Sequence, residues 1–319
     1  MNRRLLSGLA ILCGLVLLAP GTGSGATKAQ DRSSVAGNFV LLLDGQVCGV
    51  LRSATGGGAT ADVINEARGS DWTTRKHLGS PKYEEITIQV GMDACSGLYG
   101  WIAAALNNQS SRKNGAVVTV DYDYKEISRV EFFNALISEI GFPAMDGSAK
   151  EPVYLTVKLS PEQTRRMKGG GAKVNVGTSQ QKRWLPSNFR FQIAGLDAAT
   201  TRVNRIEAFT VKVKITEGGG GRDAQKQPAG LEIPNLSFTL PESYADAVYA
   251  WHEDFVIKGN NSDGKERSGT LEWLSPDQRA TYGKLNLRNI GIIRVSSEPG
   301  TGESAKRVRV DVYVETVGF

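Results

Sequence analysis

Few residues of this chain have the types and spacing needed for catalysis or metal binding. The 319 residues include only two histidines, His77 and His252, which lie far apart in the sequence. Asp121 and Asp123 alternate with Tyr122 in an expected strand, which would place both carboxylates on one face. Paired acids can act as general acid and base or bind calcium. A solvated strand face is the more common interpretation of such a pair.

The glycine and serine motifs of common enzymes are missing from the sequence as well. Gly218–Gly221 is followed by Arg222-Asp223 and not by the Gly-Lys-Ser/Thr of a phosphate-binding loop. The Gly-x-Ser-x-Gly pattern of a nucleophile elbow occurs nowhere. The sequence therefore predicts a protein that is not an enzyme and has no catalytic residue, no metal site and no cofactor. A hydrolase whose cleft gathers Asp121, Asp123 and His77 is the alternative.

The order of secondary-structure elements is clearest between Tyr83 and Asn107. Apolar residues alternate with polar ones from Ile86 to Val90, as in a strand with one buried face. From Leu98 to Ala105 they recur at three- and four-residue spacing, which is typical of a helix with one apolar stripe. The pattern predicts a strand, a brief turn and a short helix.

The same unit returns 150 residues later. Tyr99 and Trp101 recur as Tyr249 and Trp251. Matches at the same offset occur at both ends of the unit, where Asn38-Phe39 and Ile140-Gly141 correspond to Asn188-Phe189 and Ile290-Gly291. We interpret the chain as one domain present twice. Six or seven expected strands and one inserted helix in each copy predict a mainly β protein, with two tandem small antiparallel β-barrel or sandwich domains.

The repeat and the composition together predict five segments along the chain. They are a signal peptide (1–26), a flexible arm (27–37), copy 1 (38–160), a Gly-rich, basic linker (161–187) and copy 2 (188–319).

Residues 1–26 have the layout of a secretory signal peptide. Arg3 and Arg4 precede an apolar run from Leu5 to Leu18, and Ser24-Gly25-Ala26 supplies small residues for cleavage. The run is short for a membrane span, so we expect no span in the mature chain and export to the periplasm or beyond the cell. The net charge of +5 includes both leader arginines, and the remaining excess is too mild to indicate specific nucleic-acid binding.

Two cysteines, Cys48 and Cys95, remain after the leader. At the repeat offset both positions hold alanine, Ala198 and Ala245, so the two cysteines differ between the copies as a pair. A disulfide in copy 1 would produce this pattern, and export would permit it. Two buried, unpaired thiols are the alternative, because free cysteine often packs as a small apolar residue.

Copy 1 carries several short stretches that resemble the T4-like phage tail tube protein family. They are Asn38-Phe39-Val40 with Asp44-Gly45, the run from His77 to Tyr83 that leads into Ile86-Thr87-Ile88, Leu98-Tyr99 with Trp101, Asn134-Ala135, and the closing strand from Val153 to Leu159. The resemblance implies a β-barrel with a flanking helix that assembles into stacked hexameric rings. A tandem pair of such domains would form a similar ring from three chains.

The resemblance and the repeat lead to two expectations for function. The first is a structural protein that binds other copies of itself and forms trimeric, pseudo-hexameric rings or tubes. Its contacts would involve strand edges, the arm and an expected polar loop at 69–81. The second is an exported monomeric binding or accessory module that reuses the fold.

Aromatic and basic residues in polar segments are the candidates for an interface. Trp72, Arg75 and Lys76 lie in the expected loop at 69–81, and Trp184 lies in the expected linker. An aromatic side chain in such a segment is typical of an anchor between proteins.

Overall fold

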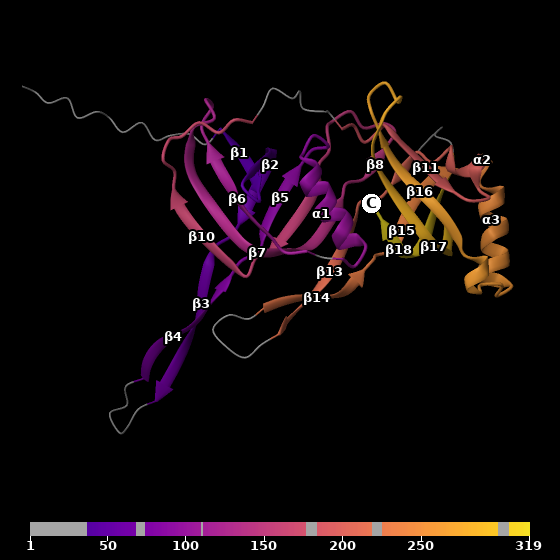
Figure 1. The fold of residues 1–319 in the computed structure, drawn as a ribbon. Coiled ribbons are helices and arrows are strands. Elements are labelled where there is room, and N and C mark those ends of the chain that lie inside the picture. The colour runs from indigo at the N-terminus through magenta and orange to yellow at the C-terminus, as the bar shows by residue number, and fades with distance from the viewer. Residues whose placement is uncertain (1–36, 68–73, 110, 177–183, 219–224, 299–305) are drawn as a thin grey trace, which may run out of the picture. The chain divides into compact units, whose positions relative to one another are not determined.

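A closed barrel of six antiparallel strands forms the first half of the chain, as seen in a computed structural model (Figure 1). The structure describes residues 37–67, 74–109, 111–176, 184–218, 225–298 and 306–319. The predicted signal peptide (1–26) and the predicted arm as far as residue 36 lie outside these ranges.

The barrel follows the order β7-β6-β1-β2-β5-β9 and closes because β9 also pairs with β7. Its strands are β1 (Asn38–Leu43), β2 (Gln46–Gly56), β5 (Ile86–Val90), β6 (Lys113–Val120), β7 (Glu126–Phe142) and β9 (Leu155–Ser160). Strand β10 (Gln163–Lys168) continues along β7 beyond β9. The alternation predicted for residues 86–90 is confirmed, because Ile86, Ile88 and Val90 are buried in β5.

Helix α1 (Ser96–Leu106) contributes the apolar stripe expected from the sequence. Leu98, Trp101, Ile102 and Ala105 are all buried, and the indole Nε1 of Trp101 donates to the carbonyl oxygen of Ser111 at 2.7 Å. We call the barrel with α1 and β10 the first lobe.

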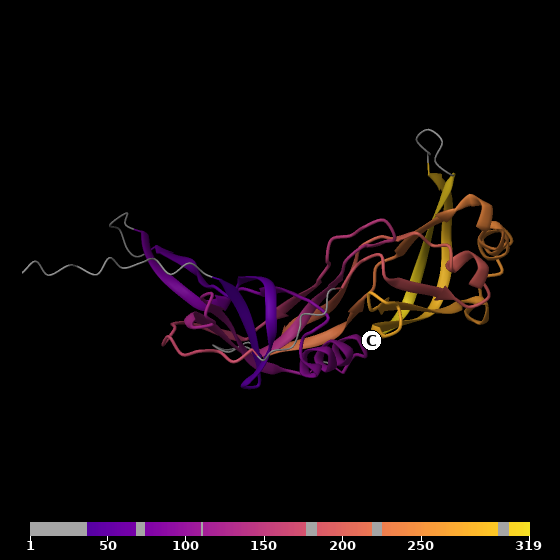
Figure 2. The same ribbon diagram turned by 90° about the horizontal axis from the view of Figure 1, so that it is seen from above.

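A second sheet of seven antiparallel strands forms most of the second half of the chain, in the order β11-β16-β17-β18-β15-β12-β8 (Figure 2). Its strands are β8 (Met145–Asp146), β11 (Phe189–Ile193), β12 (Arg205–Ile206), β15 (Leu236–Pro241), β16 (Arg267–Leu274), β17 (Thr281–Glu298) and β18 (Arg307–Gly318). Its helices are α2 (Asp197–Thr200), η1 (Glu242–Tyr244), α3 (Asp246–His252), η2 (Glu253–Ile257) and η3 (Asp263–Lys265). We call this sheet with its helices the second lobe. The predicted mainly β fold class is confirmed.

Two hairpins leave the lobes at corresponding places in the chain. Strands β3 (Ala59–Ala67) and β4 (Thr74–Tyr83) pair only with each other, whereas β13 (Phe209–Gly218) and β14 (Gln225–Glu232) join the sheet of the first lobe through β7. In return, β8 from the first half of the chain pairs with β12 of the second lobe. Each lobe therefore contains a strand from the other half of the sequence, and one apolar core runs through both lobes.

Two segments differ from their predictions because backbone pairing outweighs polar composition. Residues 74–81 of the expected loop belong to β4, where Pro81 and Leu78 lie opposite Ala61 and Val63. The expected linker at 161–187 begins with β10, whose residues pair with Ser128–Phe133 of β7. Strand β7 has 17 residues, and β9 pairs with only part of this edge. All residues of the basic segment Gln163–Lys168 can therefore pair with the rest of β7.

The prediction that Asp121 and Asp123 lie on one face of a strand is also wrong. Strand β6 ends at Val120, and Asp121 begins a turn. The carboxylate oxygen Oδ1 of Asp121 accepts hydrogen bonds from the backbone N–H groups of Asp123 (2.9 Å) and Lys125 (2.8 Å). Aspartate commonly stabilises a turn in this way, so this carboxylate has a structural role.

A disulfide joins Cys48 of β2 to Cys95, the residue that caps the N-terminus of α1. Replacing both cysteines by alanine should lower the free energy of unfolding by about 2–4 kcal/mol, because the bond closes a long loop in the unfolded chain. Denaturant titration of the variant measures the loss. Reduction of the unmodified protein should give a similar decrease, and equal stability of the oxidised and reduced protein would contradict the bond.

Candidate assembly surfaces

The residues that could have done chemistry do not gather into a site. His77 lies on β4 with its Nε2 at 3.5 Å from Glu66 Oε2, and more than half of its side chain is exposed. His252 is the last residue of α3 in the second lobe. No group of three or more His, Cys, Asp or Glu side chains within the described ranges could hold a metal ion. Sheet edges and exposed apolar residues are the other candidate surfaces.

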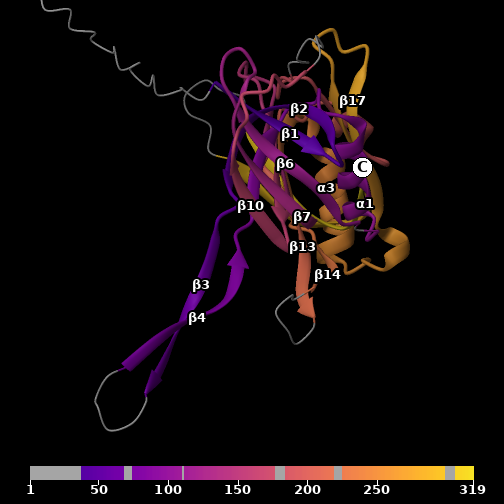
Figure 3. The same cartoon turned by 60° about the vertical axis from the view of Figure 1, so that its left-hand side comes forward.

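The hairpin β3–β4 is the first such surface, and it extends away from the barrel (Figure 3). Val63, Ile64 and Leu78 are 55%, 49% and 74% exposed, and Val63 lies directly opposite Leu78. A two-stranded ribbon without a covered face is marginally stable in water. Three exposed apolar side chains on such a ribbon make it a candidate interaction surface.

The predicted interface residues have different positions. Arg75 and Lys76 are exposed on β4, whereas Trp72 lies outside the described residues. Trp184 is only 1% exposed and packs edge-on against Trp273 at 5.5 Å between ring centroids, so it is not available to a partner. Lys182 and Arg183 precede it in the sequence, and only the structure reveals that it belongs to the core. The sequence analysis did not select Val63, Ile64 and Leu78 of the hairpin. Their apolar side chains among mostly polar neighbours were the signal that could have identified them.

The second hairpin shows how a hairpin of this kind is covered. Residues Phe209–Lys212 of β13 pair in antiparallel register with Glu139–Phe142 of β7, with Phe209 opposite Phe142. The rings of Phe142 and Phe209 stack at 4.8 Å, and Trp273 of the second lobe stacks on Phe142 at 5.5 Å. The contact therefore combines a backbone ladder with aromatic stacking in the core.

Polar contacts hold the outer part of β13–β14 against the first lobe. Glu162 Oε1 accepts a hydrogen bond from the backbone N–H of Lys226 at 3.0 Å. The same oxygen forms an ion pair with Arg112 Nε at 3.3 Å. The Nζ group of Lys226 donates to the hydroxyl of Ser160 at 3.0 Å. These contacts lie at the turn between β9 and β10, so they fix the hairpin to the end of the barrel.

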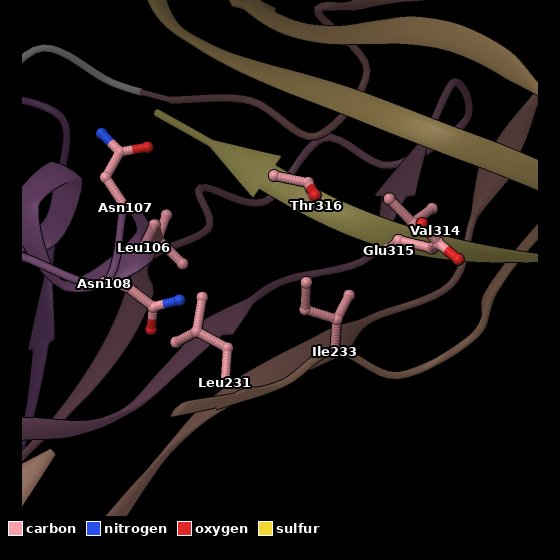
Figure 4. A pocket seen from close by; sticks show the side chains of 8 residues that line it. All are labelled: Leu106, Asn107, Asn108, Leu231, Ile233, Val314, Glu315 and Thr316. Atoms are coloured by element: carbon pink, nitrogen blue, oxygen red, sulfur yellow. The ribbon is translucent and has the colours of Figure 1, made fainter. Parts of the chain in front are cut away.

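A groove lies beside this contact, between the end of α1, strand β14 and strand β18 (Figure 4). Leu231 of β14 and Ile233, just after this strand, point into it, and Glu315 and Thr316 of β18 form the opposite side. On the helix side, Leu106 is 2% exposed, and Tyr99 stacks on Phe319 at 5.9 Å. The end of α1 in the first lobe is thus buried against the second lobe.

Strand β17 provides an uncovered edge in the second lobe. Strand β16 pairs with it only as far as Ile290, while β18 pairs with its other edge as far as Glu298. Residues Arg294–Ser297 thus have one edge without a strand partner among the described residues. Unpaired N–H and C=O groups on such an edge are a template for another strand.

Asp311 of β18 organises the charges on the opposite, paired edge of β17. Its carboxylate accepts hydrogen bonds from the hydroxyl of Ser237 (2.6 Å), from Arg294 Nε (2.8 Å) and from Arg309 Nε (3.1 Å). Burial raises the pKa of this carboxyl, but the three donors outweigh burial and leave the pKa below its ordinary value. Arg294 is thereby held toward β18, on the paired side of β17.

Asp311 should make stability depend on pH in the acid range. Because its pKa is lower in the folded state, its contribution is present above the unfolded value of about 3.9 and is lost as pH falls through the folded pKa. Asp311→Asn should therefore be less stable than the unmodified protein at pH 7, and the difference should shrink below about pH 4. Denaturant titrations at pH 7 and pH 3 test this, and a difference independent of pH would contradict it.

Phe142 should be the side chain on which the contact between the lobes depends most. It is 1% exposed between Phe209 and Trp273. Phe142→Ala should lower the free energy of unfolding by about 3–5 kcal/mol, because the cavity would open at the junction of both lobes. Tyr122→Ala, at a side chain that is 73% exposed, is the control and should change stability by no more than about 0.5 kcal/mol. Equal effects of the two substitutions would contradict the assignment.

Comparison with known proteins identifies a relative of the first lobe. Residues 35–165 match the family model described as T4-like virus tail tube protein gp19. The resemblance predicted from the sequence is thereby confirmed for this part of the chain. The matched residues run from just before β1 to the middle of β10, so the match spans the closed barrel. The comparison with curated proteins gives no match.

Solved structures of injection systems are similar to part of the chain. One is the sheath–tube complex of an extracellular contractile injection system (PVC) in the extended state, with 17% identity and a TM-score of 0.38 over 46% of this chain and 99% of that chain. Another is the tube-terminating cap of the anti-feeding prophage, with 20% identity and a TM-score of 0.37 over 45% of this chain and 99% of that chain.

Proposed function

Because residues 35–165 match the T4-like tail tube family, we propose that this protein is a structural, non-enzymatic component that assembles with other copies of itself into rings or a tube. The family match over the closed barrel is the observation that carries the proposal. The exposed hairpin β3–β4 and the uncovered edge of β17 support it, because both are surfaces that a second chain can cover.

The proposal includes an internal duplication, with copies at 38–160 and 188–319. The two lobes follow the same strand order, since β1-β6-β7-β9-β5 corresponds to β11-β16-β17-β18-β15. The hairpins β3–β4 and β13–β14 occupy the same place in each copy, between the second and the central strand. Three chains would then supply six similar domains, and a trimer would form a pseudo-hexameric ring.

Export is part of the same proposal. The layout of residues 1–26 supports a cleaved leader, and the disulfide between Cys48 and Cys95 suits an oxidising compartment such as the periplasm or the extracellular space. None of the helices in the described ranges is long and apolar enough to cross a membrane. The predicted leader also favours a second candidate function, an exported monomeric binding module with the same fold.

The mass of the leader-free protein (residues 27–319) decides between these functions. Light scattering and negative-stain microscopy should show trimers, rings or stacked tubes. A monomer at every concentration would overturn the assembly and favour the binding module.

Polar substitution of the exposed hairpin should weaken assembly and leave the fold intact. In the variant Val63→Ser/Ile64→Ser/Leu78→Ser, all three side chains are at least 49% exposed, so stability should change little. Sedimentation should then show a shift toward smaller species, while circular dichroism stays the same. Tyr122→Ser, which is equally exposed but lies on a turn of the barrel, is the matched control. An unchanged sedimentation profile of the hairpin variant would show that the hairpin takes no part in assembly.

A further inference from the structure

We infer that the second lobe binds the first lobe of another copy, through the surface that corresponds to the contact between the lobes within one chain. The inference rests on the proposed self-assembly and assigns the residues that meet. It follows from four correspondences between the lobes: the strand edge, the hairpin, the helix end and a charged pair.

The strands β7 and β17 correspond residue by residue. Asn134 and Asn289 both adopt a left-handed backbone conformation, with φ of 49° and 54°. They are 155 residues apart, so Ile140-Gly141 corresponds here to Val295-Ser296, and the expected match to Ile290-Gly291 at an offset of 150 is wrong. Each strand has a register shift four residues later, at Ser138 in β7 and at Ile293 in β17. An asparagine in this conformation is uncommon, so two at the same distance from a bulge fix the alignment.

This alignment shows that one edge is covered in the first lobe and uncovered in the second. Strand β6 pairs with β7 as far as Ala135, and β13 then takes over at Glu139–Phe142. Strand β16 pairs with β17 as far as Ile290, the counterpart of Ala135. The counterpart of Glu139–Phe142 is Arg294–Ser297, which has no strand on this edge among the described residues.

The strand that would cover this edge is at the base of the free hairpin. Ala54 lies opposite Ile88 in the first lobe, and Ile206 lies opposite Phe238 in the second. Because Ile88 and Phe238 correspond at the offset of 150, Ala54 corresponds to Ile206. The strands that follow them, β3 and β13, are aligned from these two residues. Ala59 then corresponds to Val211, whose partner on β7 is Ile140. Transferred to β17, the register places Ala59 of one chain opposite Val295 of the next.

The helix ends show the same difference in burial. Leu106, at the end of α1, is 2% exposed and lines the groove opposite β18 of the second lobe. The corresponding part of the second lobe ends in Val256 and Ile257, which are 39% and 70% exposed. Tyr99 is stacked on Phe319, whereas its counterpart Tyr249 is 38% exposed. Apolar residues are therefore exposed where a first lobe would cover them.

A charged pair is available at the corresponding polar contact. Within the chain, Glu162 binds the backbone of Lys226. The residues at these places in the other copy are Glu315 on β18 and Lys76 on β4, and both are exposed. Lys76 of one chain can thus approach Glu315 of the next.

A contact of this kind is heterologous, since each chain offers one face and accepts a different one. Such contacts continue from chain to chain until the ring closes, or they extend as a filament when the rotation does not close. The partner is therefore a second copy of this chain in head-to-tail order.

Cysteine cross-linking between two single variants tests the assigned register. Ala59→Cys protein mixed with Val295→Cys protein should form a disulfide-linked heterodimer under mild oxidation, because directly opposed residues have Cβ atoms about 4.5–5.5 Å apart. Thr60→Cys mixed with Val295→Cys is the control, since neighbouring side chains of a strand point to opposite faces. The control pair should not cross-link.

Substitution of the exposed helix end tests the same surface without new cysteines. Ile257→Asp should weaken self-association about tenfold or more, because it would bury an unpaired charge in the contact. Tyr122→Asp, at a similarly exposed residue on the turn between β6 and β7, should leave it unchanged.

The outcomes separate this inference from the proposed function. Oligomers that form without the 59–295 cross-link, and that tolerate Ile257→Asp, would overturn the assigned surface and leave self-assembly standing. A protein that stays monomeric at every concentration would overturn both.

Discussion

The length of strand β7 is the constraint on which the rest of the structure depends. It has 17 residues, and β6 covers one edge only as far as Ala135. Unpaired backbone groups in a core are costly, so the remaining edge must receive another strand. The second half of the chain supplies it as β13, and the first half supplies β8 to the second lobe. The two lobes are therefore joined through hydrogen-bonded strands, and the stack of Phe209, Phe142 and Trp273 fills the space behind them.

The same requirement explains why two similar hairpins behave differently. Hairpin β13–β14 has a covered edge and charged contacts at Arg112 and Glu162. Hairpin β3–β4 has no such cover within the described parts of the chain, and it carries ion pairs between its own strands, such as Lys82 with Asp62 at 2.6 Å. Exposed ion pairs of this kind stabilise little. Charges on an exposed ribbon do limit unspecific pairing with other strands.

Patterns of local periodicity predicted much of the fold, whereas pairing over long distances was out of their reach. Alternation at Ile86–Val90 and helical spacing at Leu98–Ala105 depend on one buried face, and the structure confirms both. The strand character of residues 74–81 and of 163–168 depends on partners on β3 and β7, and neither segment shows it in its composition. Trp184 was misassigned for the same reason, because its burial comes from Trp273, far along the chain. Of the candidate assembly surfaces, the sequence indicated strand edges in general and Arg75 and Lys76 on the hairpin, whereas the position of the uncovered edge of β17 is defined by where β16 stops.

The differences between the two corresponding contacts indicate how strong each must be. Within the chain, Phe142 and Phe209 face each other, whereas their counterparts in the proposed contact between chains are Ser297 and Gly57. The second contact thus retains the backbone ladder and the apolar helix end but lacks the aromatic stack. Backbone pairing specifies register without adding much apolar area, so affinity would depend on Ile257, on the hairpin and on closure of the ring. Closure converts the last contact of a ring into an intramolecular one, which compensates for weak individual contacts. A permanent contact inside the chain and a weaker one between chains would let the protein fold alone and assemble only at sufficient concentration.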